Sequence, residues 1–585
     1  MYILGFSCYY HDASAALLKD GIVVAAASEE RFTRKKHDPS FPRNAIRYCL
    51  DSQEITIDDI DHVAFYEKPF LKFERILHQH LEMFPRSFRL FLRSTPPLLV
   101  DKMRVLRKAR KVLKYTGDVH FIGHHLSHAS SCFLPSPFES AAILTADGVG
   151  EWTTTTLGHG KGTDISLHKE LDFPHSLGLL YSTITAYLGF RVNNSEYKVM
   201  GLAAYGNTDR ETNRYYNRLL KILDLKADGS FRLDTRYFSY HYSERMPSRR
   251  LCRLLGGPVR KPESDVRKRH KDIAAAVQML AEDVIIRMLD HLYEETKESN
   301  LVLAGGVALN SVINGRILSK TPFENIWIQP NASDGGASLG AALFVHNTLL
   351  GNRRNQLTSP YLGPSFSAEQ VRAFLERNNI TFTEFENNDK LIDTTARLIH
   401  ENNVVGWFQG SMEWGPRALG ARSILADPTN PRAKDVLNEK VKHRESFRPF
   451  APVVCREDAD TYFACDDPLP EPADYMLMVY DVKEQWREKL PSITHVDGSA
   501  RLQTVSKEQH GLYYSLIKRF GNYSGIPMLI NTSFNIRGEP IVCTPEDAYR
   551  CMMGTGIDYL VIERFLISRE DNPGDKWNSE NHVTE

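Results

Sequence analysis

Two histidines four residues apart are the first sign of chemistry in this sequence. His124 and His128 lie in GHHLSHASS, and on a helix this spacing places both imidazoles on one face. Asp147 ends the apolar run AAILTAD, and Asp334 starts a Gly-Gly turn after IWIQPNAS. Carboxylates at the carboxyl ends of strands face the crevice where α/β proteins bind ligands. Two imidazoles and two carboxylates with open positions predict a site for Fe(II), Mn(II) or Zn(II).

A structural interpretation of the same residues stays open. A histidine at the start of a helix can cap it, and both aspartates can serve turns. His11, which precedes Asp12 in the first loop, is a candidate general base because imidazole titrates near neutral pH. A His-Asp pair in a loop can equally be part of a turn.

Glycine turns at strand ends predict a nucleotide site in the same half of the chain. LVLAGGVALN places Gly305 and Gly306 where a strand gives way to a helix, which lets the backbone approach a phosphate closely. EYKVMGLAAYG supplies Glu196 and Lys198 before a similar turn. These two side chains face a ligand or form an ordinary surface ion pair.

Positive charge is concentrated between residues 417 and 448. This stretch has eight Lys or Arg and four Asp or Glu, a local +4 in a chain of net charge −1. Many of the charges lie among glycines, prolines and aromatics, which favours phosphate capture over a solvated helix face. Further along, Arg501, Ser533 and Asn535 are polar groups that could hold an amide group or a nucleotide.

The elements that position these residues alternate between strand and helix. Three strands are expected within residues 2–28, and a helical period runs from Ile273 to Met288. This alternation predicts a mostly parallel sheet covered by helices. Residues 14–21 resemble residues 140–148, which indicates a duplicated α/β unit. Residues 349–367 have the composition of a linker, and a second α/β pattern follows it.

Composition excludes several classes of protein. A net charge of −1 gives no overall attraction for nucleic acid or for a membrane. The eight cysteines include no CxxC pair, so neither a disulfide framework nor a cysteine zinc site is expected. With no signal peptide or membrane span in the pattern, we expect a cytoplasmic protein. Two basic stretches, 70–115 and 240–271, are solvated insertions or shape an acceptor pocket or a dimer contact.

The order of the motifs resembles that of a known family. HDASAALLKDG, ERFTRKKHD, HHLSHA, DGVGEW, EYKVMGLAAYG, LAGGVALN and SDGGASLGAA fill the first half, and GPRALGARSI, KHRESFRPFAP, SARLQTV and NTSFNIRGEPIV fill the second. In these motifs the chain resembles O-carbamoyltransferases that modify nodulation factors, antibiotics and toxins. The resemblance implies an α/β protein with a duplicated actin-like ATPase (RNase H-like) domain with helical insertions (1–355), a YrdC-like α/β domain (356–570) and a polar tail (571–585).

The resemblance also implies roles for individual residues. The iron ligands would be His124, His128, Asp147 and Asp334, and the catalytic histidine His11. The carbamoyl-adenylate site would include Lys36, Glu196, Lys198, Gly305, Gly306 and Asn310. The site for ATP and carbamoyl phosphate would include Arg417, Lys442, Arg448, Arg501, Ser533 and Asn535.

The implied reaction has two steps. Carbamoyl phosphate and ATP, with Mg²⁺, give carbamoyl adenylate and pyrophosphate in the second domain. The carbamoyl group then passes to a hydroxyl of a small-molecule acceptor at the metal site of the first, with release of AMP. Neither nucleic acid nor membrane is an expected partner, and a homodimer is compatible with the sequence. A tRNA threonylcarbamoyl-type modification enzyme and a sugar kinase with an actin-like fold are the alternatives.

Overall fold

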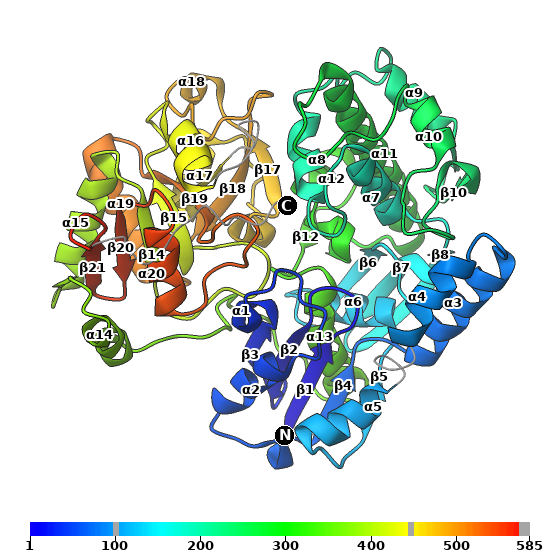
Figure 1. The fold of residues 1–585 in the computed structure, drawn as a ribbon, viewed down its shortest axis with the longest axis horizontal. Helices are drawn as coiled ribbons and strands as arrows, with labels where there is room; N and C mark the ends of the chain where they lie inside the picture. The colour runs from blue at the N-terminus through cyan, green and yellow to red at the C-terminus, as the bar shows by residue number, and fades with distance from the viewer. Residues whose placement is uncertain (98–103, 443–449, 573–585) are drawn as a thin grey trace. The chain divides into compact units, whose positions relative to one another are not determined.

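Two five-stranded sheets that share the same strand order form the framework of the amino-terminal half (Figure 1). The orders are β3-β2-β1-β4-β5 and β8-β7-β6-β11-β12. In each sheet only the second strand from one edge, β2 or β7, runs antiparallel to the others. The strands are β1 (Tyr2–Ser7), β2 (Ser14–Lys19), β3 (Ile22–Ser28), β4 (His62–Phe65), β5 (Val119–Phe121), β6 (Ser140–Ala146), β7 (Thr153–Lys161), β8 (Asp164–Asp172), β11 (Asn300–Ala304) and β12 (Asn325–Trp327).

The repeated order confirms the predicted duplicated α/β fold, but not the sequence match that first indicated it. Residues 14–19 form β2, whereas residues 140–146 form β6. By position in its sheet, β6 corresponds to β1, and β2 corresponds to β7. The similar Ser-Ala-Ala runs therefore lie on strands that are not equivalent. Both are buried strands, and burial alone favours such small apolar residues.

Two helices form the layer between these sheets. Helix α13 (Asp334–Leu343) packs on β1, β2 and β4, and α6 (His124–Phe133) packs on β6, β7 and β11. The two helices also pack on each other. A Cβ at Gly340 would lie 1.9 Å from the carbonyl oxygen of Ser127, so this close approach requires glycine. The first residue of each helix is a predicted metal ligand.

Other helices surround α11 (Lys268–Thr296), which contains the predicted helical period. They are α7 (Leu177–Tyr187), α8 (Glu196–Ala203), α9 (Arg214–Leu220) and α12 (Ser311–Lys320). The basic stretch 70–115 contains α3 (Pro69–Glu82), α4 (Phe88–Pro97) and α5 (Val105–Lys108), and it connects the parallel strands β4 and β5. The stretch 240–271 contains α10 (Arg249–Leu254) and the start of α11.

The carboxyl-terminal half is built on a mixed nine-stranded sheet of order β13-β21-β20-β14-β15-β19-β16-β18-β17. Its strands are β13 (Thr383–Glu384), β14 (Val405–Phe408), β15 (Arg422–Ala426), β16 (Ala451–Cys455), β17 (Met478–Asp481), β18 (Ser499–Val505), β19 (Met528–Ser533), β20 (Tyr559–Ile562) and β21 (Phe565–Ser568). Helices α15 (Asn388–His400) and α19 (Gly511–Ser524) pack together and share a buried core with the sheet, including Trp407 and Leu516. The predicted second α/β domain is confirmed in its class.

The computed structural model describes residues 1–97, 104–442 and 450–572, and the chain divides into two units. The first comprises Met1–Glu29 and His37–Leu357, and the second comprises Glu30–Lys36 and Thr358–Glu585. The main boundary, between Leu357 and Thr358, lies two residues beyond the expected boundary between residues 355 and 356. The segment Glu30–Lys36 was expected in the first domain but belongs to the second unit. Most of the expected tail 571–585 lies outside the described residues. Asn572 within it is buried and exchanges two hydrogen bonds with the backbone of Thr381 (2.8 and 3.1 Å).

Candidate metal centre

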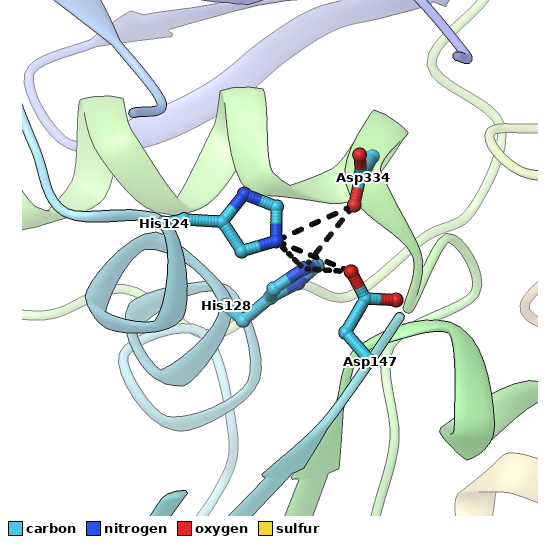
Figure 2. Close-up of side chains that lie close together, drawn as sticks. All are labelled: His124, His128, Asp147 and Asp334. Carbon is cyan, nitrogen blue, oxygen red and sulfur yellow. Dashed lines mark hydrogen bonds and ion pairs between the residues drawn. The ribbon is translucent and has the colours of Figure 1, made fainter. Parts of the chain in front are cut away.

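The four predicted metal ligands lie together in the first unit, although they come from separate elements (Figure 2). His124 and His128 occupy the first two turns of α6, Asp147 follows β6, and Asp334 begins α13. Asp147 is 5% exposed and the other three are fully buried. The two Nε2 atoms lie 3.1 Å apart, and they lie 3.2 to 3.9 Å from Asp147 Oδ2 and Asp334 Oδ1.

These distances fit one shared cation. Ligands about 2.1 Å from a metal in tetrahedral or octahedral geometry stand about 3.0 to 3.4 Å apart. Both carboxylate oxygens of Asp334 are buried without a hydrogen-bond donor among the described residues. A buried carboxylate in that state is strongly destabilising unless a cation compensates it. The imidazole and carboxylate donors therefore fit a divalent metal ion such as Fe(II), Mn(II) or Zn(II).

The charges inside the cluster are strongly coupled. Burial disfavours a charged imidazole, but the carboxylates of Asp334 and Asp147 outweigh burial and raise the pKa of His124. Burial also acts against ionised Asp147, yet the neighbouring His124 and His128 hold the pKa of its carboxyl well below its usual range. The cluster thus retains carboxylate charge in a buried site, as a metal centre requires.

Two backbone N–H groups fix the ligand positions. Both carboxylate oxygens of Glu151 accept from the backbone N–H of His124 (3.0 and 3.1 Å) at the start of α6, where the helix dipole favours negative charge. The N–H of Gly306 donates to Asp147 Oδ1 (2.9 Å), and Asp147 Oδ2 faces the histidines. Glu151 was missed by the sequence analysis. Gly306, which was predicted to approach a nucleotide, contacts a predicted metal ligand.

His11 lies beside the cluster, with Nε2 3.8 Å from Asp334 Oδ2. Its Nδ1 is hydrogen bonded to Asp12 Oδ2 (2.9 Å), and the other oxygen of Asp12 bonds His37 Nδ1 (2.7 Å). His37 Nε2 in turn bonds Asn194 Oδ1 (2.9 Å). Burial lowers the pKa of His11, but the Asp334 and Asp12 carboxylates more than offset this effect and raise the pKa to about 10. The sequence analysis assigned no role to His37 or Asn194, because they meet only through the fold.

The predicted adenylate-binding residues of the first unit also make structural contacts. Asn310 caps α12 through Ile313 N (3.2 Å), and its amide pairs with that of Gln278 (3.0 and 3.2 Å). Gly305 has a φ of +94°, and a Cβ there would lie 2.2 Å from a backbone oxygen. Glu196 and Lys198 begin α8; Glu196 accepts from Ser182 Oγ (2.7 Å), and Lys198 is buried.

Three predicted phosphate-site residues meet in the second unit. The buried Lys442 Nζ donates to the carbonyl oxygen of Ser533 and to Asn535 Oδ1 (2.8 Å), and Ser533 Oγ also contacts that Oδ1 (2.7 Å). Arg417 lies in the loop before β15, and Arg501 lies on β18. Arg448 lies outside the described residues.

Part of the basic cluster supports the fold of a neighbouring loop. Arg422 is fully buried and donates to four carbonyl oxygens, at Gln409, Gly410, Ala421 and Pro364 (2.8 to 3.0 Å). Glu413 Oε1 accepts from the backbone N–H groups of Leu419, Ala421 and Arg422 (2.7 to 2.9 Å). The loop GPRALGA is therefore held in one conformation, which preorganises the position of Arg417. Arg422 itself has a structural role.

The segment Glu30–Lys36 adds two arginines to this unit. Arg31 donates to the carbonyl oxygen of Gly415 (2.9 Å) at the start of the same loop. Arg34 donates to the carbonyl oxygens of Pro540 (2.8 Å) and Ile541 (2.7 Å). The segment also carries Lys36, a predicted adenylate contact. Sequence reasoning missed both arginines, because their partners lie hundreds of residues away.

Comparison with known proteins shows the family of this chain. A family model described as the carbamoyltransferase N-terminus matches residues 2–343, and one described as the carbamoyltransferase C-terminus matches residues 396–569. The chain belongs to the carbamoyltransferase family. Its predicted membership is thereby confirmed, and the protein is a transferase enzyme.

Two relatives illustrate how far this similarity extends. The protein sll1178 of Synechocystis is 46% identical, and the alignment covers 99% of both chains. The nodulation protein NolNO of Sinorhizobium fredii is 37% identical over 97% of this chain and 80% of its own length. Among the described residues, none of the helices combines the length and apolar character that a bilayer crossing needs.

Proposed function

We propose that this carbamoyltransferase is an O-carbamoyltransferase that works through carbamoyl adenylate. Carbamoyl phosphate, ATP and water give carbamoyl adenylate, pyrophosphate and phosphate, and the carbamoyl group then passes to an acceptor hydroxyl with release of AMP. The observation that carries the proposal is the buried His124–His128–Asp147–Asp334 cluster with His11 beside it. The family membership supports the transferred group, and the cluster supports the site of transfer.

The first half-reaction belongs to the second unit in this proposal. Lys442 carries a positive charge into a buried site with Ser533 and Asn535, where it would offset phosphate charge as pyrophosphate leaves. The rigid loop that bears Arg417 supplies a second cation close to glycine backbone. Mg²⁺ would accompany ATP, and Arg448 and Arg501 would complete the phosphate contacts.

The second half-reaction belongs to the first unit. His124, His128, Asp147 and Asp334 would hold Fe(II), with Mn(II) or Zn(II) as alternatives. When bound, that ion supplies a Lewis acid that polarises a carbonyl or phosphoryl oxygen. Asp12 orients His11 through Nδ1, so that Nε2 faces the cluster. A cation held by Asp334 and Asp147 would offset the carboxylate charge that raises the pKa of His11, and the neutral ring could then accept the proton of the acceptor hydroxyl. Within this unit, the adenylate contacts would be Glu196, Lys198, Gly305, Gly306 and Asn310.

The two half-reactions can be separated by substitution. Lys442→Ala should stop pyrophosphate release from ATP and carbamoyl phosphate, because a phosphate oxygen loses its cation. His11→Ala should leave pyrophosphate release unchanged and block transfer, because the proton acceptor is gone. Pyrophosphate is assayed enzymatically, and transfer is assayed by mass spectrometry on a panel of polyhydroxylated acceptors.

Three outcomes would contradict this assignment. One is ADP in place of AMP as the nucleotide product, which a sugar kinase would give. Another is equal loss of pyrophosphate release in both variants, which would place the two steps in one site. The third is carbamoylated product formed by His11→Ala at the rate of the unmodified enzyme.

A further inference from the structure

Helix α3 has its polarity reversed with respect to an ordinary surface helix. It buries Lys72 (3% exposed) and Arg75 (6%), whereas Phe70, Leu77 and Leu81 are 72%, 36% and 68% exposed. A helix on a water-facing surface normally buries its apolar stripe and exposes its charges. Glu74, His78 and Glu82 are also exposed on α3, but the four large apolar side chains beside them, which include Leu71, match an apolar environment better than water.

The apolar face continues onto α4. Phe84, Phe88 and Leu92 are 68%, 49% and 57% exposed, and the rings of Phe84 and Phe88 lie 6.4 Å apart. Helix α4 is held against α3 through His80, whose ring lies 5.3 Å from that of Phe91. The two helices lie at the outer edge of the first unit (Figure 1). Seven of the fourteen exposed large apolar side chains among the described residues fall between Phe70 and Leu92, a concentration that marks an interaction surface.

Strong positive charge surrounds this apolar face. Residues 68–114 contain thirteen Lys or Arg and three Asp or Glu in a chain of net −1. Lys72 and Arg75 are buried and Arg93 pairs with Glu244 (2.9 Å), which still leaves ten Lys or Arg against three acids. Arg86 and Arg89 are exposed between the phenylalanines, and Arg104, Arg107 and Arg110 are exposed on and next to α5. Two copies of the chain that met through this face would bring two such charges together. A nucleic acid would satisfy the charge but would leave the phenylalanines and leucines in water.

We propose that the α3–α4 face, defined as residues 68–93, docks on an anionic lipid surface. Phenylalanine and leucine side chains that enter the acyl boundary, with arginines at the level of anionic headgroups, satisfy both features of the face at once. The docking is peripheral, so it needs no membrane-crossing helix. It revises the expectation of no membrane partner, and it does not depend on the proposed reaction.

The test uses the full chain and vesicles of stated composition. Co-sedimentation with phosphatidylcholine vesicles is compared with vesicles that also contain phosphatidylglycerol, at low and high salt. We expect strong binding only to the anionic vesicles, weakened by salt. The double variant Phe84→Ser, Phe88→Ser should bind at least about tenfold more weakly, because two aromatic side chains no longer enter the membrane. Arg86→Glu and Arg89→Glu should each weaken binding to the anionic vesicles by at least about fivefold.

A matched control carries the same kind of change elsewhere. Ile22→Ser and Val496→Ser replace side chains that are 57% and 56% exposed outside the face, and both should bind vesicles like the unmodified protein. Equal binding of all variants, or binding to neutral vesicles alone, would overturn the proposal. A second outcome would also overturn it. If light scattering shows a dimer, and the Phe84→Ser, Phe88→Ser variant is a monomer with unchanged vesicle binding, the occupant of the face is a second copy of the chain.

Discussion

Gly306→Ala should weaken metal binding without touching any of the four ligands. A Cβ at position 306 would lie 2.9 Å from Asp147 Oδ1, whereas an ordinary contact begins at 3.4 Å. The carboxylate must therefore move by about 0.5 Å, and metal–ligand distances tolerate only about 0.2 Å. The same movement stretches the hydrogen bond from Gly306 N (2.9 Å) that orients Asp147. Loss of such an orienting contact typically costs 10- to 100-fold in metal affinity, and about that loss is expected here.

The assay is an anaerobic titration with Co(II) or Fe(II) against a competing chelator, with the Co(II) absorption spectrum as a second readout of the ligand set. Gly123→Ala is the matched control. It lies directly before His124, but its Cβ would have no neighbour closer than 3.9 Å, so its metal affinity should stay within about twofold. Unchanged affinity and spectrum in Gly306→Ala would refute the role of Gly306 in positioning Asp147.

Two further predictions concern stability in the second unit. Arg422→Ala should lower the free energy of unfolding by at least about 3 kcal/mol in urea titrations, because four buried carbonyls lose a charged donor. Exposed Arg432→Ala, in the same basic cluster, should change it by less than about 0.5 kcal/mol, and equal effects would contradict the structural role of Arg422. Burial lowers the pKa of His510 to about 4, and its Nδ1 accepts from Tyr513 N at the start of α19. The fold favours the neutral ring of His510. The stability that this ring contributes is therefore fully present above about pH 6.5 and is lost as pH falls toward 4. His510→Asn keeps a capping acceptor but does not titrate, so the melting temperature should depend less on pH over that range. An unchanged dependence of the melting temperature on pH would contradict the assignment.

The position of the predicted metal ligands could be anticipated because local rules place them. The i, i+4 spacing puts His124 and His128 on one helix face. Asp147 directly follows β6, and Asp334 begins the helix that comes after β12. The supporting contacts could not be anticipated. Glu151 reaches the start of α6 through tertiary structure alone, and no periodic pattern records such a contact.

The second unit illustrates a different limit. Local composition cannot distinguish an arginine that binds a phosphate from one that is hydrogen bonded to backbone carbonyls, as Arg422 is. Nor can it assign ERFTRKK to the second unit, because Arg31 and Arg34 find their partners 384 and more than 500 residues away. The reversed polarity of α3 was equally hidden. Its charge and its apolar residues were visible in the sequence, but which of them is buried depends on tertiary contacts, such as those of Lys72 with Glu67 (2.6 Å) and of Arg75 with the ring of Phe173 (5.0 Å).

The most direct test of the account is the metal content of three proteins reconstituted with Fe(II) under anaerobic conditions. The unmodified enzyme should hold about one equivalent, and His128→Ala should lose it together with carbamoyl transfer, because a ligand is removed from a four-residue site. His125→Gln is the control. His125 is buried next to the cluster, but its two nitrogens bond Thr145 Oγ1 (2.7 Å) and the carbonyl oxygen of Thr153 (2.9 Å), so this variant should keep the metal. Full metal occupancy in His128→Ala, or equal loss in both variants, would contradict the metal centre.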